Sequence, residues 1–381
     1  MIDRADAPGV AALGRASRAW YTTTVAMPKK VLVTGGTGFV GGRLALALAA
    51  AGERVVVLAR PGANVCALRE AGVQVAEGDI RVEHTVFRAM AGCDRVYHCA
   101  AVYTLWARHP AAVMSGAIDG TMNVLRSAHA RGLERVVYTS TAYTVGSSAT
   151  PEELDETTEW TEPSGPVYAI AKRRAEEQAL EYAARTELPL IVVNPGGVFG
   201  PGDSRPTPSG QGILDVLTSP ALPFLGTLVP RAPGGMNIVD IDDVVDGHRR
   251  AMEHGKLGER YLLTGDNVPI STFFETLTSL VGRPAPRLRA TRAMALATGA
   301  LLSAIARITD VPPKLSLETA RGTFGRFFYF SHAKATRDLG YEARPARRTL
   351  ARSVRYYIDR GYVSPRLVRA MRLDATAMAA A

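Results

Sequence analysis

The sequence predicts an α/β fold, a doubly wound parallel sheet joined to a smaller C-terminal substrate-binding domain. From residue 30 onward, short runs rich in valine, isoleucine and leucine alternate with helix-like segments. Near-continuous apolar runs of this kind are typical of parallel strands that are buried on both faces by helices. The chain has 381 residues, more than the roughly 250–300 at which a single hydrophobic core stops growing. We therefore expect two structural units.

Each element of the sheet domain is predicted from its local pattern. Short apolar runs bounded by glycine or polar residues predict strands over residues 31–34, 54–59, 73–76, 95–99, 135–139 and 190–194. Longer amphipathic or alanine-rich segments predict helices over residues 39–51, 82–91, 111–131 and 167–185. The many prolines and glycines of residues 195–236 predict loops over a site. Later helices are expected over residues 271–281, 293–307 and 348–360.

Changes in composition predict the domain boundaries. Residues 1–28 are expected to be a flexible extension, with Met27 as an alternative start of translation. The sheet domain is expected to cover residues 29–195, with a return segment at about residues 237–264. The substrate-binding region is assigned to residues 196–236 and 265–365. Residues 366–381 form a basic, alanine-rich tail.

Composition excludes several classes of protein. With 47% hydrophobic and 21% charged residues, the chain is too apolar for a disordered protein. The net charge of +9 is concentrated at the two ends, which argues against a nucleic-acid-binding face within the fold. No segment reaches the roughly 20 apolar residues of a membrane span, although the basic ends are compatible with peripheral membrane contact. Three cysteines, at positions 66, 93 and 99, predict no disulfide framework and no metal site, and favour a reducing, cytoplasmic setting.

A glycine-rich turn follows the first predicted strand. Residues 34–41 read T-G-G-T-G-F-V-G, so Gly36, Gly38 and Gly41 fit G-x-G-x-x-G, while Gly35, Gly38 and Gly41 fit T-G-x-x-G-x-x-G. Glycine lets the backbone turn tightly and approach a pyrophosphate, whose charge is met by the N-terminus of the next helix. With a strand before it and a helix after it, the motif predicts a Rossmann-type dinucleotide site.

The end of the second strand indicates which dinucleotide binds. NAD sites usually place an acidic residue there, whereas this chain has Arg60. An arginine can pair with a 2′-phosphate, which favours NADP(H) over NAD(H), although a solvated loop arginine is the alternative interpretation. Asp79, after the third strand, could accept a hydrogen bond from the adenine amino group or simply form a turn.

Tyr168 and Lys172 are four residues apart on a predicted helix and therefore share a face. A nearby ammonium and a nicotinamide cation favour the phenolate and are expected to lower the tyrosine pKa, so that Tyr168 can act as a general acid or base. Ser140 and Thr141 follow the fifth predicted strand, at the end of the sheet where parallel sheets bind ligands. One of these hydroxyls could hold a substrate oxygen.

Together these motifs resemble those of extended short-chain dehydrogenases/reductases, the NAD-dependent epimerase/dehydratase family. The similarity covers residues 29 to about 360 and includes residues 98–101, 194–203 and 237–244. Within that family the chain is most similar to hopanoid-associated sugar epimerase-like proteins and to dihydroflavonol-4-reductase-like proteins. Enzymes of the 3β-hydroxysteroid dehydrogenase kind are also similar.

The resemblance implies roles for particular residues. It assigns catalysis to Thr141, Tyr168 and Lys172. It implies cofactor contacts at Gly35, Gly36, Thr37, Gly38, Phe39, Val40, Arg60, Asp79, Ile80, Ala100, Ala101, Tyr168, Lys172, Pro195 and Val198. The family usually has an asparagine for a proton relay where this chain has Ala117, so a relay through that position is not expected.

Three functions are compatible with these residues. The first is an NAD(P)-dependent oxidoreductase that transfers hydride between the nicotinamide, more readily that of NADP, and a ketone or secondary alcohol. The second is a nucleotide-sugar epimerase or dehydratase linked to hopanoid or other lipid biosynthesis, against which Arg60 argues. The third is a non-catalytic NADP(H) sensor, which would be expected to lack Tyr168 and Lys172. A small, lipophilic substrate and a homodimer formed through the helices at 111–131 and 167–185 are further expectations.

Smaller features have structural interpretations. His98 is expected to pack at the end of its strand, and Asp242 and Asp243 to cap a helix. The uncharged residues 293–306 are expected to line a lipophilic opening or to lie in the core. Tyr103, Leu105 and Trp106 are expected to form a loop above the nicotinamide.

Overall fold

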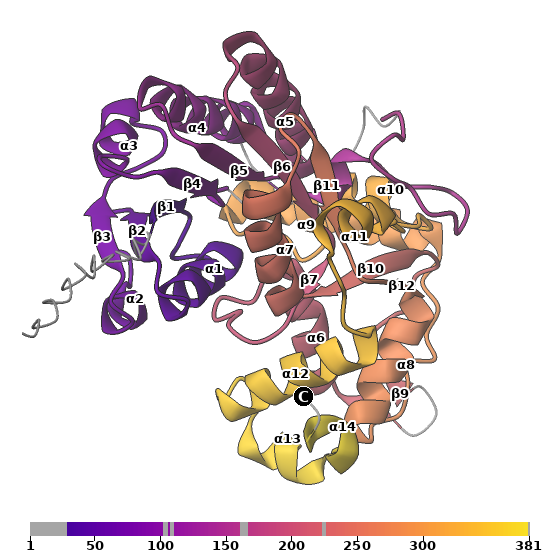
Figure 1. Ribbon diagram of the computed structural model, residues 1–381. Coiled ribbons are helices and arrows are strands. Elements are labelled where there is room, and N and C mark those ends of the chain that lie inside the picture. The colour runs from indigo at the N-terminus through magenta and orange to yellow at the C-terminus, as the bar shows by residue number, and fades with distance from the viewer. Residues whose placement is uncertain (1–28, 102–105, 107–109, 161–166, 223–225, 380–381) are drawn as a thin grey trace, which may run out of the picture.

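The computed structural model describes residues 29–101, 106, 110–160, 167–222 and 226–379 (Figure 1). Its centre is a seven-stranded sheet in which every pair of neighbouring strands is parallel. The strand order is β11 (Arg260–Leu263), β6 (Leu190–Pro195), β5 (Arg135–Thr139), β4 (Arg95–His98), β1 (Lys30–Thr34), β2 (Arg54–Ala59) and β3 (Gln74–Glu77). The predicted α/β class is confirmed. The order reverses between β1 and β4, and open parallel sheets bind ligands at such a reversal.

Helices cover both faces of this sheet (Figure 1). One face packs against α1 (Phe39–Ala50), α2 (Cys66–Glu70), α7 (Ile241–His254) and α11 (Ala333–Leu339). The other face packs against α3 (Glu83–Ala89), α4 (Pro110–Ala130) and α5 (Val167–Thr186). The predicted helices of the sheet domain are thus found within a few residues of their expected bounds, the usual uncertainty at helix ends.

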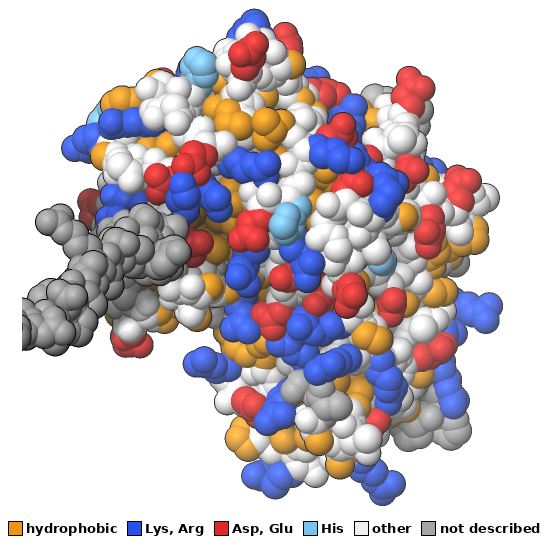
Figure 2. Space-filling model, in the orientation of Figure 1, with side chains coloured by type: hydrophobic (Ala, Val, Ile, Leu, Met, Phe, Trp, Pro, Cys, Tyr) orange, Lys and Arg blue, Asp and Glu red, His pale blue; other side chains and the backbone are white. Residues whose placement is uncertain are grey.

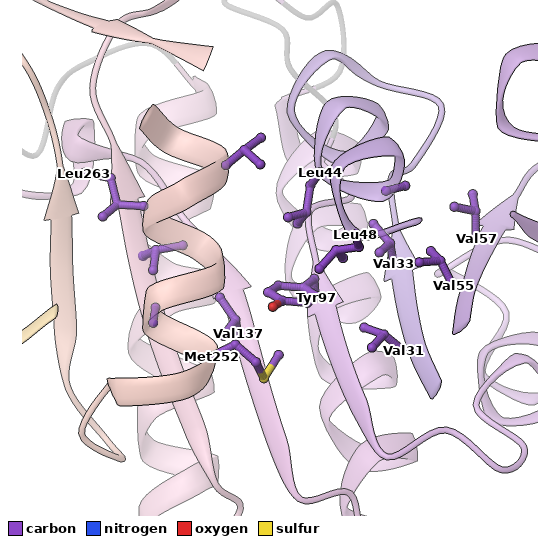
Figure 3. Packing of buried hydrophobic residues seen from close by; sticks show 14 of the residues in the cluster. Val31, Val33, Leu44, Leu48, Val55, Val57, Tyr97, Val137, Met252 and Leu263 are labelled. Atoms are coloured by element: carbon purple, nitrogen blue, oxygen red, sulfur yellow. The ribbon is translucent and has the colours of Figure 1, made fainter. Parts of the chain in front are cut away.

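Alternating side chains along each strand fill the two cores. In β1, Val31 and Val33 belong to the core under α1, whereas Leu32 belongs to the core on the opposite face. Figure 3 shows Leu44 and Leu48 of α1 near these valines. Period-two alternation is what a strand buried on both faces requires, and it fixes the register that aligns the carboxyl ends of β1, β4 and β5.

The C-terminal residues build a second, smaller layer around its own core. A three-stranded sheet has the order β12 (Asp266–Pro269), β10 (Gly235–Asp240), β7 (Val198–Phe199). It packs with α6 (Pro208–Thr218), α8 (Ile270–Val281) and α12 (Ala346–Asp359). The remaining elements are η1 (Ala142–Thr144), β8 (Ala221–Leu222), β9 (Gly226–Thr227), α9 (Arg292–Thr309), α10 (Leu317–Thr323), α13 (Pro365–Ala370) and α14 (Ala375–Ala379).

The expectation of loops throughout residues 195–236 is wrong, because α6 lies in this segment. Thr207 caps the helix by accepting a hydrogen bond from the Gly210 backbone N–H, and a proline occupies its first turn. Ile213 and Leu217 are fully buried against the C-terminal core. Burial of this apolar face stabilises a helix whose proline and glycines, read alone, indicate loop.

Charged side chains of both signs are mixed on one side of the molecule. Figure 2 shows basic and acidic side chains interspersed over α7 and α12. Over these two helices the charges therefore form no patch of a single sign.

Candidate active site

A pocket opens at the carboxyl ends of β1, β4, β5 and β6, where the strand order reverses. It brings together the glycine-rich turn, the Tyr–Lys pair and the end of β5. The predicted residues that line it are Gly35, Gly38, Phe39, Val40, Ala101, Thr141, Tyr168, Lys172, Pro195 and Val198. Residues far apart in the sequence thus converge on one site.

The glycine-rich turn has the geometry of a phosphate cradle. Gly35 has φ +72°, and a Cβ there would lie 2.6 Å from the Ala100 backbone nitrogen. A Cβ on Gly41 would lie 2.4 Å from the Gly35 carbonyl oxygen. Gly38 is the N-cap of α1 and has no side chain to accept a hydrogen bond from the backbone N–H groups of the first helical turn. A bare helix N-terminus of this kind suits a pyrophosphate, so the residues present fit a dinucleotide.

Charged residues lie at the ends of the next two strands. Arg60 is exposed after β2, and its positive charge contributes to lowering the pKa of Asp79, after β3. The principal cause of that lower pKa is Arg81, whose Nη2 donates to Asp79 Oδ2 at 2.7 Å. Two arginines therefore lie near each other beyond the pocket lining, and sequence analysis identified only Arg60.

The predicted catalytic residues meet at the junction of β5, η1 and α5. Thr141 is buried, caps η1 and hydrogen-bonds with the Tyr168 side chain. Lys172, one turn after Tyr168 on α5, is only 3% exposed, and its Nζ donates to the Thr139 carbonyl oxygen at 2.7 Å. Ser140 also lines the pocket. The arrangement places a phenol, an ammonium and a hydroxyl around one space.

The chain's own residues do not lower the tyrosine pKa as expected. Burial raises the pKa of Tyr168, and this effect outweighs the lowering by the Lys172 charge and by the hydrogen bond with Thr141. Burial also lowers the pKa of Lys172. A raised tyrosine pKa keeps the phenol protonated at neutral pH, which is the form that donates a proton.

A chain of hydrogen bonds leads from Lys172 into the protein interior. Lys172 Nζ donates to Tyr138 Oη at 3.1 Å, and Tyr138 hydrogen-bonds with Thr121. Thr121 Oγ1 lies 3.2 Å from His98 Nε2, and His98 Nδ1 lies 2.7 Å from Thr34 Oγ1. Burial lowers the pKa of His98 to about 3, so this histidine is neutral and, as expected, packs at a strand end. These hydrogen bonds end at buried side chains and not at solvent. We therefore assign them the role of holding the Lys172 ammonium in position.

A buried carboxylate lies one helical turn beyond Lys172. Glu176 is 1% exposed, and its Oε2 accepts from Asn194 Nδ2 at 2.8 Å and from Thr144 Oγ1 at 3.0 Å. Its other oxygen lies 3.1 Å from Arg260 Nε. Asn194 Nδ2 also lies 3.2 Å from the carbonyl oxygen of Thr141, the residue predicted to be catalytic, and so links it to this carboxylate. Sequence analysis missed Glu176, although its i+4 spacing from Lys172 was a usable signal.

Six predicted cofactor residues do not line the pocket. Gly36 is needed for packing, because a Cβ there would lie 2.6 Å from the Val57 side chain. Ala100 lies beside Gly35, while Arg60 and Asp79 follow β2 and β3. Thr37 and Ile80 also lie outside the lining. A dinucleotide extends along several strand ends, so the pocket lining covers only part of the predicted cofactor site.

Other lining residues form an aromatic and apolar patch, beside which lie the polar side chains of Thr207, Ser209 and Asn237. The apolar patch contains Tyr143, Met236, Phe328 and Phe330, and the Tyr143 and Phe328 rings lie 4.9 Å apart. Sequence analysis missed these residues, although residues 327–330 read F-F-Y-F. Among the lining residues that the structure describes, Lys172 is the one with a cationic side chain.

Three smaller expectations need correction or fall outside the described chain. Asp240, not Asp242 or Asp243, is the N-cap of α7, and its side chain accepts from the Asp242 N–H. The helix at residues 293–306 neither lies in the core nor lines the pocket. Tyr103 and Leu105 lie outside the described residues.

The fold and the pocket define a nicotinamide-dinucleotide-dependent oxidoreductase of the extended short-chain dehydrogenase/reductase type. A family model described as the NAD dependent epimerase/dehydratase family matches residues 31–263. The chain belongs to this family. Its members bind nicotinamide cofactors and act on small molecules.

Known relatives cover nearly the whole chain. A putative dihydroflavonol 4-reductase of Synechocystis is 30% identical and covers 89% of this chain and 97% of its own length. Sterol demethylase protein B of Methylococcus capsulatus is 34% identical over 68% of this chain and 76% of its own length. The crystal structure of gox2253 has a TM-score of 0.76 and 32% identity, and the match covers 88% of this chain and all of the other.

Proposed function

We propose that the protein is an NADPH-dependent reductase of a neutral, lipophilic ketone. The observation that carries the proposal is the composition of the pocket. Tyr168, Lys172 and Thr141 share it with the phosphate turn. The rest of the lining combines the apolar and aromatic Tyr143, Met236, Phe328 and Phe330 with the uncharged polar side chains of Thr207, Ser209 and Asn237. A hydrophobic wall with a few polar groups suits an apolar substrate whose one carbonyl oxygen is held in place.

The chain's own residues supply proton transfer and orientation. A bound nicotinamide dinucleotide supplies the hydride in the reducing direction. Tyr168 donates its phenolic proton to the substrate oxygen as that oxygen gains negative charge, and the Thr141 hydroxyl hydrogen-bonds to the same oxygen. The charge of Lys172 stabilises the resulting phenolate, and the one N–H that is not donated to Thr139 or Tyr138 would anchor a ribose hydroxyl of the bound cofactor. The raised pKa of Tyr168 suits this direction, because the phenol is protonated before the reaction.

Preference for NADPH is proposed from the arginines beyond the pocket. The exposed Arg60 and Arg81 follow neighbouring strands, and the side chain of Asp79 is bound by Arg81. A 2′-phosphate would be attracted by both guanidinium groups.

The alternative is a nucleotide-sugar epimerase, which the family description includes. Such a substrate brings a negatively charged diphosphate, and buried charges require partners. Among the described lining residues no arginine is present, and Lys172 is engaged by Thr139 and Tyr138. The pocket therefore fits a neutral ketone better than a nucleotide diphosphate.

Two further inferences concern the setting of the enzyme. The three cysteines are free thiols, which supports our inference that the enzyme works in the cytoplasm. We also infer a homodimer formed through α4 and α5.

The proposal is tested by following NADPH oxidation with neutral alkyl and steroid-like ketones. Tyr168→Phe should reduce kcat by about 10²–10⁴-fold, the usual contribution of a general acid, and leave NADPH binding intact. Tyr182→Phe, on the same helix but outside the pocket lining, should retain wild-type turnover. Wild-type turnover by Tyr168→Phe would refute the assignment.

A further inference from the structure

Helix α9, whose place in the fold is shown in Figure 1, buries small residues and leaves several large apolar residues exposed. Its buried positions are Gly299, Ser303 and Ala306. Its exposed face carries Met294 (54% exposed), Leu301 (62%), Ile305 (45%) and Ile308 (85%), and Val311 (63%) follows. Surface helices of globular proteins normally turn such residues toward the core. Half of the large exposed hydrophobic residues of the described chain thus lie on or directly after one helix.

The close packing under α9 explains why its outer residues are not buried. A Cβ on Gly299 would lie 3.0 Å from the Ser316 carbonyl oxygen, so α9 approaches the start of α10 closely. Ser303 Oγ accepts from the Leu317 N–H at 3.0 Å. These contacts fix the small-residue face against α10 and therefore fix the large apolar side chains on the outside.

The charge around this face has one dominant sign. Helix α9 contains no acidic residue, and exposed Arg292 and Arg307 lie near its two ends. Residues 285–316 contain five basic residues and one acidic residue, Asp310. An apolar stripe flanked by arginines is the pattern of a helix that lies in the interface of an anionic bilayer.

We propose that the exposed face of α9 docks on an anionic lipid surface, with the helix lying in the headgroup plane. A second copy of the chain fits less well, because a two-fold contact would place the arginines of both copies against each other. Of the helices in the described residues, none combines the length and the hydrophobicity that a membrane span requires.

Short segments connect this docking face with the apolar patch of the pocket. The Ala290 N–H donates to the Arg231 carbonyl oxygen, and the Arg231 N–H donates to the Leu288 carbonyl oxygen, both at 2.9 Å. Arg231 precedes Met236 of this patch by five residues. On the other side, α10 leads to Phe328 and Phe330 of the same patch. Docking would hold the pocket near a lipid phase, although lipid binding does not depend on the proposed reaction.

The test is flotation of the full chain with two kinds of vesicle, phosphatidylcholine alone and phosphatidylcholine mixed equally with phosphatidylglycerol. Wild type should float with the anionic vesicles and much less with the neutral ones. Binding should weaken between about 0.1 M and 1 M salt, where the Debye length falls from ~10 Å to ~3 Å. Recovery of the protein unbound from both kinds of vesicle would overturn the proposal.

Variants separate this face from other exposed apolar residues. The triple change Leu301→Ser, Ile305→Ser and Ile308→Ser should lower partitioning about tenfold or more, because the apolar face supplies much of the binding. A matched triple change at Val82, Leu257 and Leu373, which are exposed elsewhere, should retain wild-type binding. Thermal unfolding and circular dichroism check that both variants fold.

Further results distinguish lipid docking from a subunit contact, and the docking proposal from the proposed ketone reduction. A wild-type dimer that the α9 triple change converts to a monomer, without any vesicle binding, would show a subunit contact and overturn lipid docking. Tyr168→Phe should bind vesicles like wild type, so failure of the proposed reduction and failure of docking are separable. Wild-type vesicle binding by the α9 triple variant would also overturn the proposal.

Discussion

At the scale of single residues, the countercharge to Lys172 is buried in the same helix. Burial lowers the pKa of Lys172, whereas electrostatic interactions with the Tyr168 and Glu176 side chains oppose this effect. Glu176 is itself held by Asn194 and Arg260. We infer that this carboxylate helps to keep the lysine cationic inside the protein.

Glu176→Gln should therefore lower the pKa of Lys172 further. Because the cationic lysine is the active form, activity falls as pH rises through its pKa, and the alkaline limb of the kcat/KM profile should move to lower pH. The neighbouring Glu177→Gln is the control, because Glu177 forms a more exposed pair with Arg173. An unmoved alkaline limb in Glu176→Gln would contradict the inferred countercharge.

The proposed preference for NADPH rests most directly on Arg60. Arg60→Ala should raise the Kd for NADPH by about 10–100-fold, the effect of losing a hydrogen bond of ~1.5–3 kcal/mol to a charged group. The Kd for NADH should change little, since NADH lacks the 2′-phosphate. Isothermal titration calorimetry measures both constants, and equal losses for the two cofactors would show that Arg60 does not read the phosphate.

At the scale of elements, the turn between β1 and α1 depends on both backbone conformation and space. Gly35→Ala should weaken dinucleotide binding by about tenfold or more, because its Cβ would displace the Ala100 backbone from the cradle. Gly52 has a similar positive φ of +85° but nothing within 4 Å of its Cβ position. Gly52→Ala should therefore destabilise folding by about 1 kcal/mol and leave affinity unchanged. Equal affinities for the two variants would argue against a steric role of Gly35.

Local patterns predicted the elements better than they predicted contacts between elements. Apolar runs and the glycine turn indicated six strands and their helices, since these signals lie within a few residues of each other. Strand β11 was not singled out, and α6 was expected to be loop. The pairing of β11 with β6 and the burial of α6 are long-range effects that a local pattern does not contain.

Some residues of the candidate site were likewise predicted from local motifs, whereas others depend on long-range contacts. The sequence motifs were sufficient to predict that Tyr168, Lys172 and Thr141 belong to one site, and all three line the same pocket. The apolar patch of the lining includes Met236 and Phe328, which lie far from the motifs in the sequence and reach the site through long-range packing. The direction of the Tyr168 pKa shift was also mistaken, because burial is a tertiary property.

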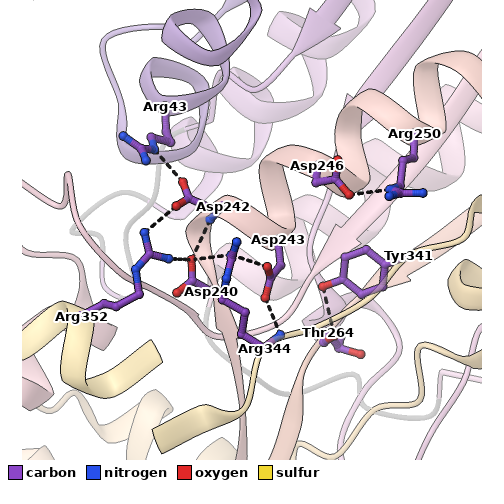
Figure 4. A network of polar contacts seen from close by, with 10 residues as sticks. All are labelled: Arg43, Asp240, Asp242, Asp243, Asp246, Arg250, Thr264, Tyr341, Arg344 and Arg352. Atoms are coloured by element: carbon purple, nitrogen blue, oxygen red, sulfur yellow. Dashed lines mark hydrogen bonds and ion pairs between the residues drawn. The ribbon is translucent and has the colours of Figure 1, made fainter. Parts of the chain in front are cut away.

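At the scale of the whole molecule, a network of ion pairs joins the cofactor helix to the C-terminal layer (Figure 4). Asp242 Oδ1 accepts from Arg43 Nε of α1 at 2.7 Å, and its Oδ2 accepts from Arg352 Nη2 of α12 at 2.5 Å. Arg352 also donates to the fully buried Asp240 at 2.6 Å. Arg344 pairs with Asp243 in the same network. These contacts connect the two layers that enclose the pocket.

Removal of one cation from this network should destabilise the whole fold. Arg352→Met should lower the free energy of unfolding by about 3 kcal/mol, because it takes a partner from a buried carboxylate. Arg355→Met, on the same helix, removes a largely exposed pair with Asp359 and should change stability by less than ~0.5 kcal/mol. Urea unfolding measures both, and equal values would show that the network is not a stabilising link.

Net reduction of a ketone is the central claim, and transfer of deuterium tests it most directly. The enzyme is incubated with a neutral ketone and NADPH that carries deuterium at the transferable nicotinamide position, and the products are analysed by mass spectrometry. We predict one deuterium on the new carbinol carbon and one NADP⁺ formed for each alcohol. Tightly held NAD that is never consumed, together with isomerisation of a nucleotide sugar without gain of deuterium, would contradict the account.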